Sequence, residues 1–228
     1  MSDFPVHPVP ESFKDAHIDA ETYTAMYRQS LDDPATFWGD MAERFLDWHK
    51  PWEEVVSYDF SRGEAAWFTG GQLNVAYNCI DRHLPEKAQA PAIIWEGDDP
   101  ADSKTVTYAE LKDAVCRLAN VLRSRGVQRG DRVVIYMPMI PEAAYAMLAC
   151  ARIGAIHSVV FGGFSPEALK DRILDCNCSV VITADEGLRG GRKITLKRNV
   201  NQALMSCPEV HSCVVVARTN ADIEWNKS

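Results

Sequence analysis

RVVIYMPMIPE, residues 132–142, joins a strand to the start of a helix. Arg132–Met137 is apolar without interruption after its first residue, which is typical of a strand covered on both faces. Pro141 and Glu142 then predict a helix start, because proline suits the first helical turn and an acid complements the helix dipole. Gly154 is the expected end of that helix. The stretch therefore predicts one strand–helix unit of an α/β sheet.

Similar units lie on both sides of this one along the chain. Ser165, Pro166 and Glu167 predict another helix start, with a preferred residue at each position. Thr107 and Glu110 form a capping box that begins an earlier helix. Further strands are predicted at 92–95, 158–161, 180–183 and 213–216, and a further helix at 196–204. Buried strands separated by helices favour parallel pairing, so the predicted fold class is α/β: an open, mostly parallel sheet with flanking helices.

The first part of the chain has a different composition. Residues 1–84 are rich in aromatic side chains and short helical signals, so a mainly helical segment is predicted before an α/β portion at 85–228. Asp33 and Pro34 predict a helix start there. Apolar residues then recur at helical spacing: Phe37, Met41, Phe45 and Trp48. Such a stripe favours packing against a neighbouring domain over an aromatic ligand site.

The charge and hydropathy of the chain exclude several classes of partner. A formal net charge of -8 over 228 residues opposes nonspecific binding to nucleic acid or to an anionic membrane, since both need a positive field. Residues 143–164 are the most apolar region, but Arg152 and His157 interrupt it, which favours a buried helix and strand over a membrane span. Residues 1–15 lack an apolar stretch, so no secretory signal is predicted and the expected compartment is the cytoplasm.

The seven cysteines predict neither a disulfide framework nor a metal site. Their odd number and scattered spacing differ from those of disulfide-rich domains. Cys176 and Cys178 could supply half of a metal site, but no second pair and no nearby histidine completes it. We therefore expect reduced thiols and no bound metal.

Two glycine-containing loops are the candidate ligand sites, because each follows a predicted strand at the carboxyl edge of the sheet. Phe161–Phe164, FGGF, could let a flat ring lie against the backbone, with phenylalanine available for stacking. The same residues could equally form a tight turn that needs positive φ. The sequence leaves these two readings open.

The second loop, residues 185–193, is strongly basic at its end. Arg189, Arg192 and Lys193 stand there without an acid among them, and Lys197 and Arg198 follow. Cations at a helix start oppose the helix dipole, so a bound phosphate would explain them, and Gly190 and Gly191 would let the backbone approach it. A solvated basic loop is the alternative. Neither G-x-G-x-x-G nor the P-loop pattern occurs in the chain.

Several longer strings closely resemble the acetyl-CoA synthetases, a branch of the acyl-adenylate-forming ligase family. The resemblance runs from about Phe37 to the end of the chain. Its most distinctive strings are WFTGG at 67–71, IIWEGD at 93–98, IYMPMIPE at 135–142, ACARIGA at 149–155, FGGF at 161–164, TADEG at 183–187 and RGGRK at 189–193.

The resemblance implies a reaction and a set of ligand contacts. Acetate and Mg-ATP would give acetyl-AMP and pyrophosphate, and the thiol of coenzyme A (CoA) would then give acetyl-CoA and AMP. In this family the R-G-G-R segment contacts the 3′-phosphate end of CoA, and the F-G-G-F turn lies near its adenine. These contacts fall on Arg189, Gly190, Gly191, Arg192, Phe161, Gly162 and Gly163.

The family's remaining sites have no counterpart in this chain. Its phosphate loop, acetate pocket and catalytic lysine correspond to positions beyond Ser228, so no catalytic residue and no metal ligand is carried over. We therefore expect an amino-terminal part of the enzyme that is inactive alone. The expected partners are small molecules, namely acetate, ATP and CoA, with no nucleic acid and no membrane. A ligase for propionate or another short acid, and a non-catalytic module that binds CoA or a nucleotide, remain as alternatives.

Overall fold

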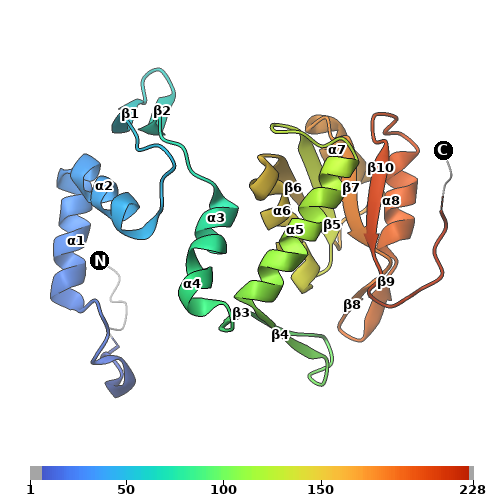
Figure 1. Cartoon of the computed structure of the whole chain (residues 1–228), viewed down its shortest axis with the longest axis horizontal. Helices are drawn as coiled ribbons and strands as arrows, with labels where there is room; N and C mark the ends of the chain where they lie inside the picture. Colours follow the sequence, from blue (N-terminus) through green and yellow to red (C-terminus); the bar gives the residue numbers. More distant parts are fainter. Residues whose placement is uncertain (1–6, 226–228) are drawn as a thin grey trace. The chain divides into compact units, whose positions relative to one another are not determined.

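A computed structural model describes residues 7–225 of the chain (Figure 1). Contacts within it divide the chain into two compact units, Met1–Leu73 and Asn74–Ser228. Each unit has its own elements and its own packing. The division predicted from the sequence, a segment at 1–84 followed by an α/β portion at 85–228, stays a prediction.

The first unit combines short helices with an antiparallel ribbon. Asp19 and Asp33 cap its two main helices by accepting the backbone N–H groups of Thr22 and Thr36. The elements are a 3₁₀ turn at Glu11–Phe13, α1 at Ala20–Asp32, α2 at Pro34–Phe45, β1 at Glu54–Asp59 and β2 at Glu64–Thr69. The β1–β2 ribbon was not predicted. Its strands contain little of the alternation that marks a half-buried strand, and most of their residues are exposed.

Aromatic residues of the first unit pack on one another. The ring centroids of Trp48 lie 4.9 Å from those of Trp52 and 5.4 Å from those of Phe68. The indole N–H of Trp48 donates to the carbonyl of Ala42 at 3.2 Å. Trp48 lies beyond the end of α2, so the helical stripe predicted through it stops at Phe45. Its ring therefore covers the end of the helix from the following loop.

The second unit is built on a four-stranded parallel sheet, which confirms the predicted fold class. Its strands are β5 at Arg132–Met137, β6 at Ile156–Phe161, β7 at Val180–Ala184 and β10 at Ser212–Val216, in the spatial order β10-β7-β5-β6. The helices are α3 at Val75–Cys79, α4 at Leu84–Lys87, α5 at Tyr108–Ser124, α6 at Pro141–Ile153, α7 at Pro166–Asp175 and α8 at Leu196–Leu204, with a 3₁₀ turn at Asp81–His83. Two antiparallel hairpins stand outside the sheet: β3 at Pro91–Glu96 with β4 at Ser103–Thr107, and β8 at Gly187–Arg189 with β9 at Arg192–Ile194.

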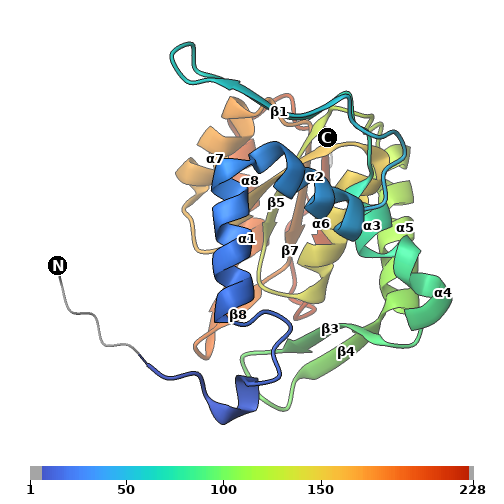
Figure 2. The same ribbon diagram turned by 90° about the vertical axis from the view of Figure 1, so that its left-hand side faces the viewer.

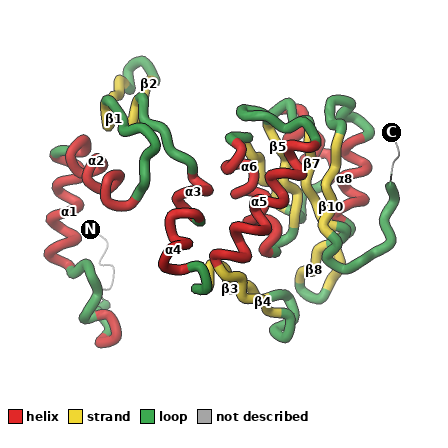
Figure 3. Tube along the Cα trace, in the orientation of Figure 1, coloured by secondary structure: helices red, strands yellow, loops and turns green. Residues whose placement is uncertain are grey.

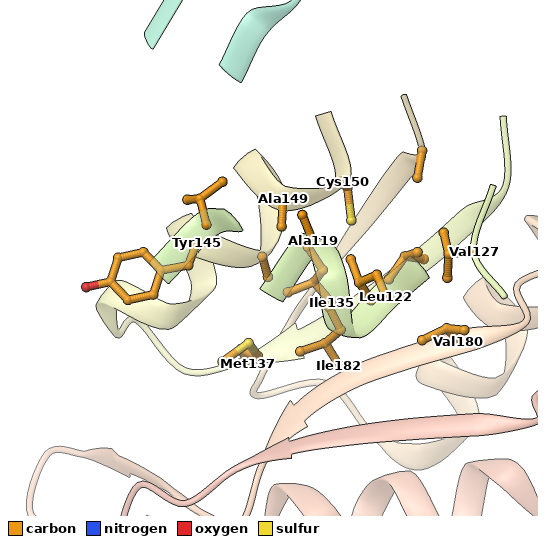
Figure 4. Packing of buried hydrophobic residues seen from close by; sticks show 14 of the residues in the cluster. Ala119, Leu122, Val127, Ile135, Met137, Tyr145, Ala149, Cys150, Val180 and Ile182 are labelled. Atoms are coloured by element: carbon orange, nitrogen blue, oxygen red, sulfur yellow. The ribbon is translucent and has the colours of Figure 1, made fainter. Parts of the chain in front are cut away.

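Helices cover both faces of this sheet, as Figure 3 shows for α5 and α8. One core contains Val133, Ile135 and Met137 of β5 together with α5 and α6, and Figure 4 shows part of it around Ile135, Leu122 and Cys150. The other core contains Val134 and Tyr136 of β5 together with α7 and α8. Alternate β5 side chains thus enter opposite cores, and this accounts for the unbroken apolar run in the sequence.

The strand order creates a switch point beside β5. After β5 the chain passes to β6 on one side, and it then returns to β7 on the other side of β5. The connection from β5 to β6 and the connection from β7 to β10 leave in opposite directions. The loops after β5 and β7 therefore separate at the carboxyl ends of these two strands. Open α/β sheets place ligands at such a point.

Residues 74–87 are tied to the sheet-bearing unit. The amide of Asn74 donates to the carbonyl of Ala151 at 3.1 Å, at the end of α6. Asp81 forms an ion pair with Arg152 on the same helix at 2.5 Å. These polar contacts place α3 and the turn that follows it beside α6.

A buried carboxylate joins the end of β7 to the segment after β10. Asp185 is 3% exposed and accepts the backbone N–H groups of Glu186 at 2.7 Å and of Arg218 at 2.8 Å. It also accepts those of Thr219 and Ala221, each at 3.1 Å. Burial alone would raise the pKa of Asp185, but these N–H groups together outweigh it and hold the pKa below its ordinary value.

Replacing this carboxylate should destabilise the fold. In Asp185→Asn an amide N–H₂ replaces one acceptor oxygen and faces backbone donors, so we expect a loss of about 3 kcal/mol in the free energy of unfolding. Urea unfolding of both proteins measures the difference. Asp175→Asn, an exposed change on α7, is the matched control and should stay within about 0.5 kcal/mol. Equal stability of Asp185→Asn and wild type would contradict this role.

The same bonds predict how stability depends on pH. Because the folded pKa of Asp185 lies below its unfolded value of 3.8, its contribution is complete above that pH and disappears as pH falls through the folded pKa. The urea midpoints of wild type and Asp185→Asn should therefore converge as pH is lowered below 3.8. If the difference between the two urea midpoints stays constant down to the pH at which both proteins unfold, the stability does not depend on the ionisation of Asp185.

Candidate functional site

A cavity of about 360 Å³ lies at the switch point of the sheet. Most of its wall comes from four separate pieces of chain, and Leu196 of α8 and Arg218 after β10 complete it. The four pieces are Met137–Ile140 after β5, Phe161–Gly163 after β6, Gly187–Arg189 with Ile194 in the β8–β9 hairpin after β7, and Glu96–Asp98 after β3. The volume falls within the range of small-molecule sites, and the wall is mostly apolar with a few charged groups, as such sites usually are.

The FGGF turn needs glycine for space. A Cβ on Gly162 would lie 3.2 Å from the carbonyl oxygen of Met137, and one on Gly163 would lie 2.6 Å from the ring of Phe161. Neither glycine has positive φ, so the alternative reading of a turn that requires it is wrong. The rings of Phe161 and Phe164 meet edge to face at 5.8 Å. Both rings remain partly exposed, and Phe161 lines the cavity.

A buried tyrosine holds this turn from below. The hydroxyl of Tyr136 donates to the carbonyl of Phe164 at 2.8 Å and lies 3.2 Å from that of Gly162. It accepts the side-chain N–H of Asn199 on α8 at 3.0 Å. Burial raises the pKa of Tyr136, so its hydroxyl keeps the proton that it donates. Strand β5 and helix α8 thus fix the turn that follows β6.

The R-G-G-R segment forms the tip of a hairpin. Gly190 and Gly191 have φ of 56° and 70°, as a two-residue type I′ turn requires, and a Cβ on either would meet nothing within 4 Å. The prediction that the arginines stand at a helix start is wrong, because α8 begins only at Leu196. The Gly-Gly pair was the available signal, since it favours a hairpin where both residues need positive φ.

The hairpin supplies a different electrostatic reason for binding an anion. Arg189 and Arg192 lie directly opposite each other across the strand pair, where like charges are unfavourable. Among residues 7–225 no ion pair joins either guanidinium to a carboxylate. Lys193, by contrast, pairs with Glu186 at 3.2 Å. A phosphate between the two arginines would relieve their repulsion.

The two candidate loops meet at the cavity. The guanidinium carbon of Arg189 lies 5.1 Å from the ring centroid of Phe161, within the range of a cation–π contact. Arg189 and Phe161 also both line the cavity. The other two cations of the basic stretch are placed elsewhere: Arg198 lies on α8, and Lys197 is buried and bonded to the carbonyl of Glu224 at 3.0 Å.

Asp98 is a site residue that was not among the candidates predicted from the sequence. Its carboxylate accepts the backbone N–H of Gly190 at 2.9 Å and that of Gly191 at 2.6 Å. The N–H groups of Gly191 and Gly190 hold the pKa of Asp98 below its ordinary value, so the group is charged at neutral pH. The turn amides that were predicted to face a phosphate are therefore already bonded to a side chain.

The described residues contain no group of three or more histidine, cysteine, aspartate or glutamate side chains that could hold a metal ion. All seven cysteines are free. The thiol of Cys178 donates to the carbonyl of Val180 at 2.9 Å, and burial raises its pKa to about 11. Within residues 7–225 no helix has the length and apolar character needed to cross a membrane.

Comparison with known proteins places both parts of the chain in one group. Residues 80–227, more than half of the chain, match the model of the AMP-binding enzyme family, and residues 23–79 match the model described as the acetyl-coenzyme A synthetase N-terminus. The acetyl-coenzyme A synthetase of Saccharophagus degradans is 63% identical over 99% of this chain. Acetyl-coenzyme A synthetase 2 of Pseudomonas aeruginosa is 61% identical over 99% of it. The chain spans 35% of the length of each of these relatives.

A solved structure agrees with these matches. Acetoacetyl-CoA synthetase from Streptomyces lividans superposes on 89% of this chain with a TM-score of 0.81 and 28% sequence identity, and the match covers 31% of that protein. The agreement of fold, sequence and family model leads to one conclusion. The chain belongs to the family of AMP-binding enzymes.

Proposed function

We propose that this chain is the amino-terminal part of an AMP-forming acetyl-CoA synthetase. The complete enzyme would convert acetate, ATP and CoA into acetyl-CoA, AMP and pyrophosphate through acetyl-adenylate. The proposal is supported by identities of 55–63% to proteins named acetyl-coenzyme A synthetase over nearly all of the chain. Acetate, ATP and CoA would be its partners, and the cytoplasm its compartment.

The role of this part would be to hold the nucleotide end of CoA. The observation that carries this role is the pair Arg189 and Arg192, which lie opposite each other across the hairpin and form no ion pair with a carboxylate among residues 7–225. The guanidinium of Arg189 also lies 5.1 Å from the centroid of the half-exposed ring of Phe161. The guanidinium groups would bind the 3′-phosphate through charge-assisted hydrogen bonds. The adenine would lie against the turn Phe161–Gly163, where the absence of Cβ atoms lets a ring approach the backbone.

The remaining ligands would be held elsewhere in the enzyme. The chain spans 35% of the length of the Saccharophagus degradans relative. No group of three or more histidine, cysteine, aspartate or glutamate side chains suited to Mg²⁺ occurs among the described residues. We therefore assign no ATP, Mg²⁺ or acetate contact and no catalytic residue to these positions. The isolated chain would bind part of CoA without forming acetyl-adenylate.

Removing one arginine should weaken CoA binding specifically. In the complete enzyme Arg192→Ala loses a charge-assisted contact, so we expect CoA binding to weaken by about 1–3 kcal/mol, measured as a rise in KM for CoA. Acetate-dependent pyrophosphate exchange, which does not require CoA, should hardly change. Arg198→Ala, in the same basic stretch but on α8, is the control. An unchanged KM for CoA together with a collapse of exchange would refute the assignment.

The choice of acid is tested separately. The resemblance of residues 95–98, WEGD, to acetate enzymes favours acetate over propionate. We expect the complete enzyme to release pyrophosphate with a higher kcat/KM for acetate than for propionate. A preference for propionate would show that acetate is the wrong acid in the proposed reaction, and it would not affect the proposed CoA contacts.

A further inference from the structure

Two hairpins outside the main sheet meet through a single carboxylate. The β3–β4 and β8–β9 hairpins both project beyond the same end of the sheet (Figures 1 and 2). Asp98, in the loop of the first hairpin, accepts both turn N–H groups of the second, from Gly190 at 2.9 Å and Gly191 at 2.6 Å. Its two oxygens take one donor each. The contact joins residues that are more than 90 positions apart along the chain.

The loop that carries Asp98 is itself firmly held. The N–H of Gly97 donates to the carbonyl of Asp102 at 2.6 Å, which closes the loop on itself. The carboxylate of Asp102 pairs with Arg218, and the guanidinium of Arg218 lies 5.0 Å from the ring centroid of Trp95. The indole N–H of Trp95 donates to the carbonyl of Met139 at 2.7 Å, on the cavity wall. Asp98 is therefore presented from a support that is fixed to the cavity.

The hairpin that receives Asp98 has little else to hold its tip. Strands β8 and β9 have three residues each, and short isolated hairpins are marginally stable in water. No heavy atom would lie within 4 Å of a Cβ at Gly190 or Gly191, so packing does not restrain the turn. The repulsion between Arg189 and Arg192 acts to open it.

We propose that Asp98 is a positioning residue, which clasps the Gly190–Gly191 turn and thereby holds Arg189 and Arg192 toward the 3′-phosphate of CoA. This inference rests on the proposed function. It adds that the backbone of the turn does not bind the phosphate, because Asp98 uses both N–H groups, and that the guanidinium side chains make the contact. In this role Asp98 acts through the turn and not through contact with the substrate.

The negative charge of Asp98 makes the direction of the effect informative. A carboxylate beside a phosphate site repels the ligand if its charge is all that matters, and its removal would then improve binding. A clasp has the opposite consequence, because its removal releases the arginines. The sign of the change in CoA affinity therefore separates the two roles.

The test compares CoA with dephospho-CoA, which lacks only the 3′-phosphate, in the complete enzyme. For Asp98→Ala we expect KM for CoA, and Kd by calorimetry, to rise about tenfold. KM and Kd for dephospho-CoA should change by less than about twofold, so that the ratio by which the enzyme prefers CoA to dephospho-CoA falls. KM for ATP and acetate and the rate of pyrophosphate exchange should stay at wild-type values. Asp99→Ala removes an equal charge from the same loop and is the matched control, because the Asp99 carboxylate accepts the N–H of Ala101 in its own loop and not a group of the β8–β9 hairpin.

Each other outcome overturns a defined statement. If Asp98→Ala leaves KM and Kd for CoA unchanged or lowers them, Asp98 does not position the arginines. If the values for dephospho-CoA rise as much as those for CoA, the loop shapes the cavity and does not act through the phosphate. If the wild-type enzyme fails to prefer CoA, or Arg192→Ala leaves that preference intact, the proposed phosphate contact itself is wrong. If Arg192→Ala abolishes the preference and Asp98→Ala does not, only the clasp fails.

Discussion

Strand β5 has hydrogen-bonded neighbours on both sides, and the rest of the sheet-bearing unit is organised around that fact. Its residues pair in parallel with β6 on one edge and β7 on the other. Val133–Tyr136 are at most 1% exposed, with alternate side chains entering the cores under α5 and α6 and under α7 and α8. A one-residue slip of this strand would exchange the side chains that enter the two cores, so its register is strongly specified and it determines where its neighbours end.

The position of the cavity is a consequence of that central strand. Because the chain leaves β5 toward β6 and leaves β7 toward β10, the loops after β5 and β7 separate at the carboxyl ends of these strands. The FGGF turn is held there by Tyr136, a β5 residue, and the β8–β9 hairpin follows β7. Core packing and the placement of site residues thus depend on the same strand, and Tyr136 belongs to both.

Electrostatics in the site are arranged so that a basic hairpin tip is stabilised without neutralising its arginines. Asp98 bonds to the backbone of the turn and not to a guanidinium, while Glu186 pairs with Lys193 and Asp102 with Arg218. The acids of the β3–β4 loop are therefore used for support. The guanidinium of Arg189 lies over the ring of Phe161 and forms no ion pair or side-chain hydrogen bond within residues 7–225, which leaves its hydrogen-bond donors available for an anion.

The sequence by itself determined the four parallel strands, the main helices of the α/β unit and the identity of the two glycine loops, but not the β4 strand or the β8–β9 hairpin. Caps such as Thr107 with Glu110, and apolar runs such as 133–137, act over a few residues, so their signals are complete in the local sequence. Only the tertiary structure decided which strands are neighbours, that FGGF needs glycine for space and not for φ, and that RGGR is a hairpin tip held by Asp98. These features depend on residues brought together from distant parts of the chain, and no local pattern encodes a contact whose partner lies 90 residues away.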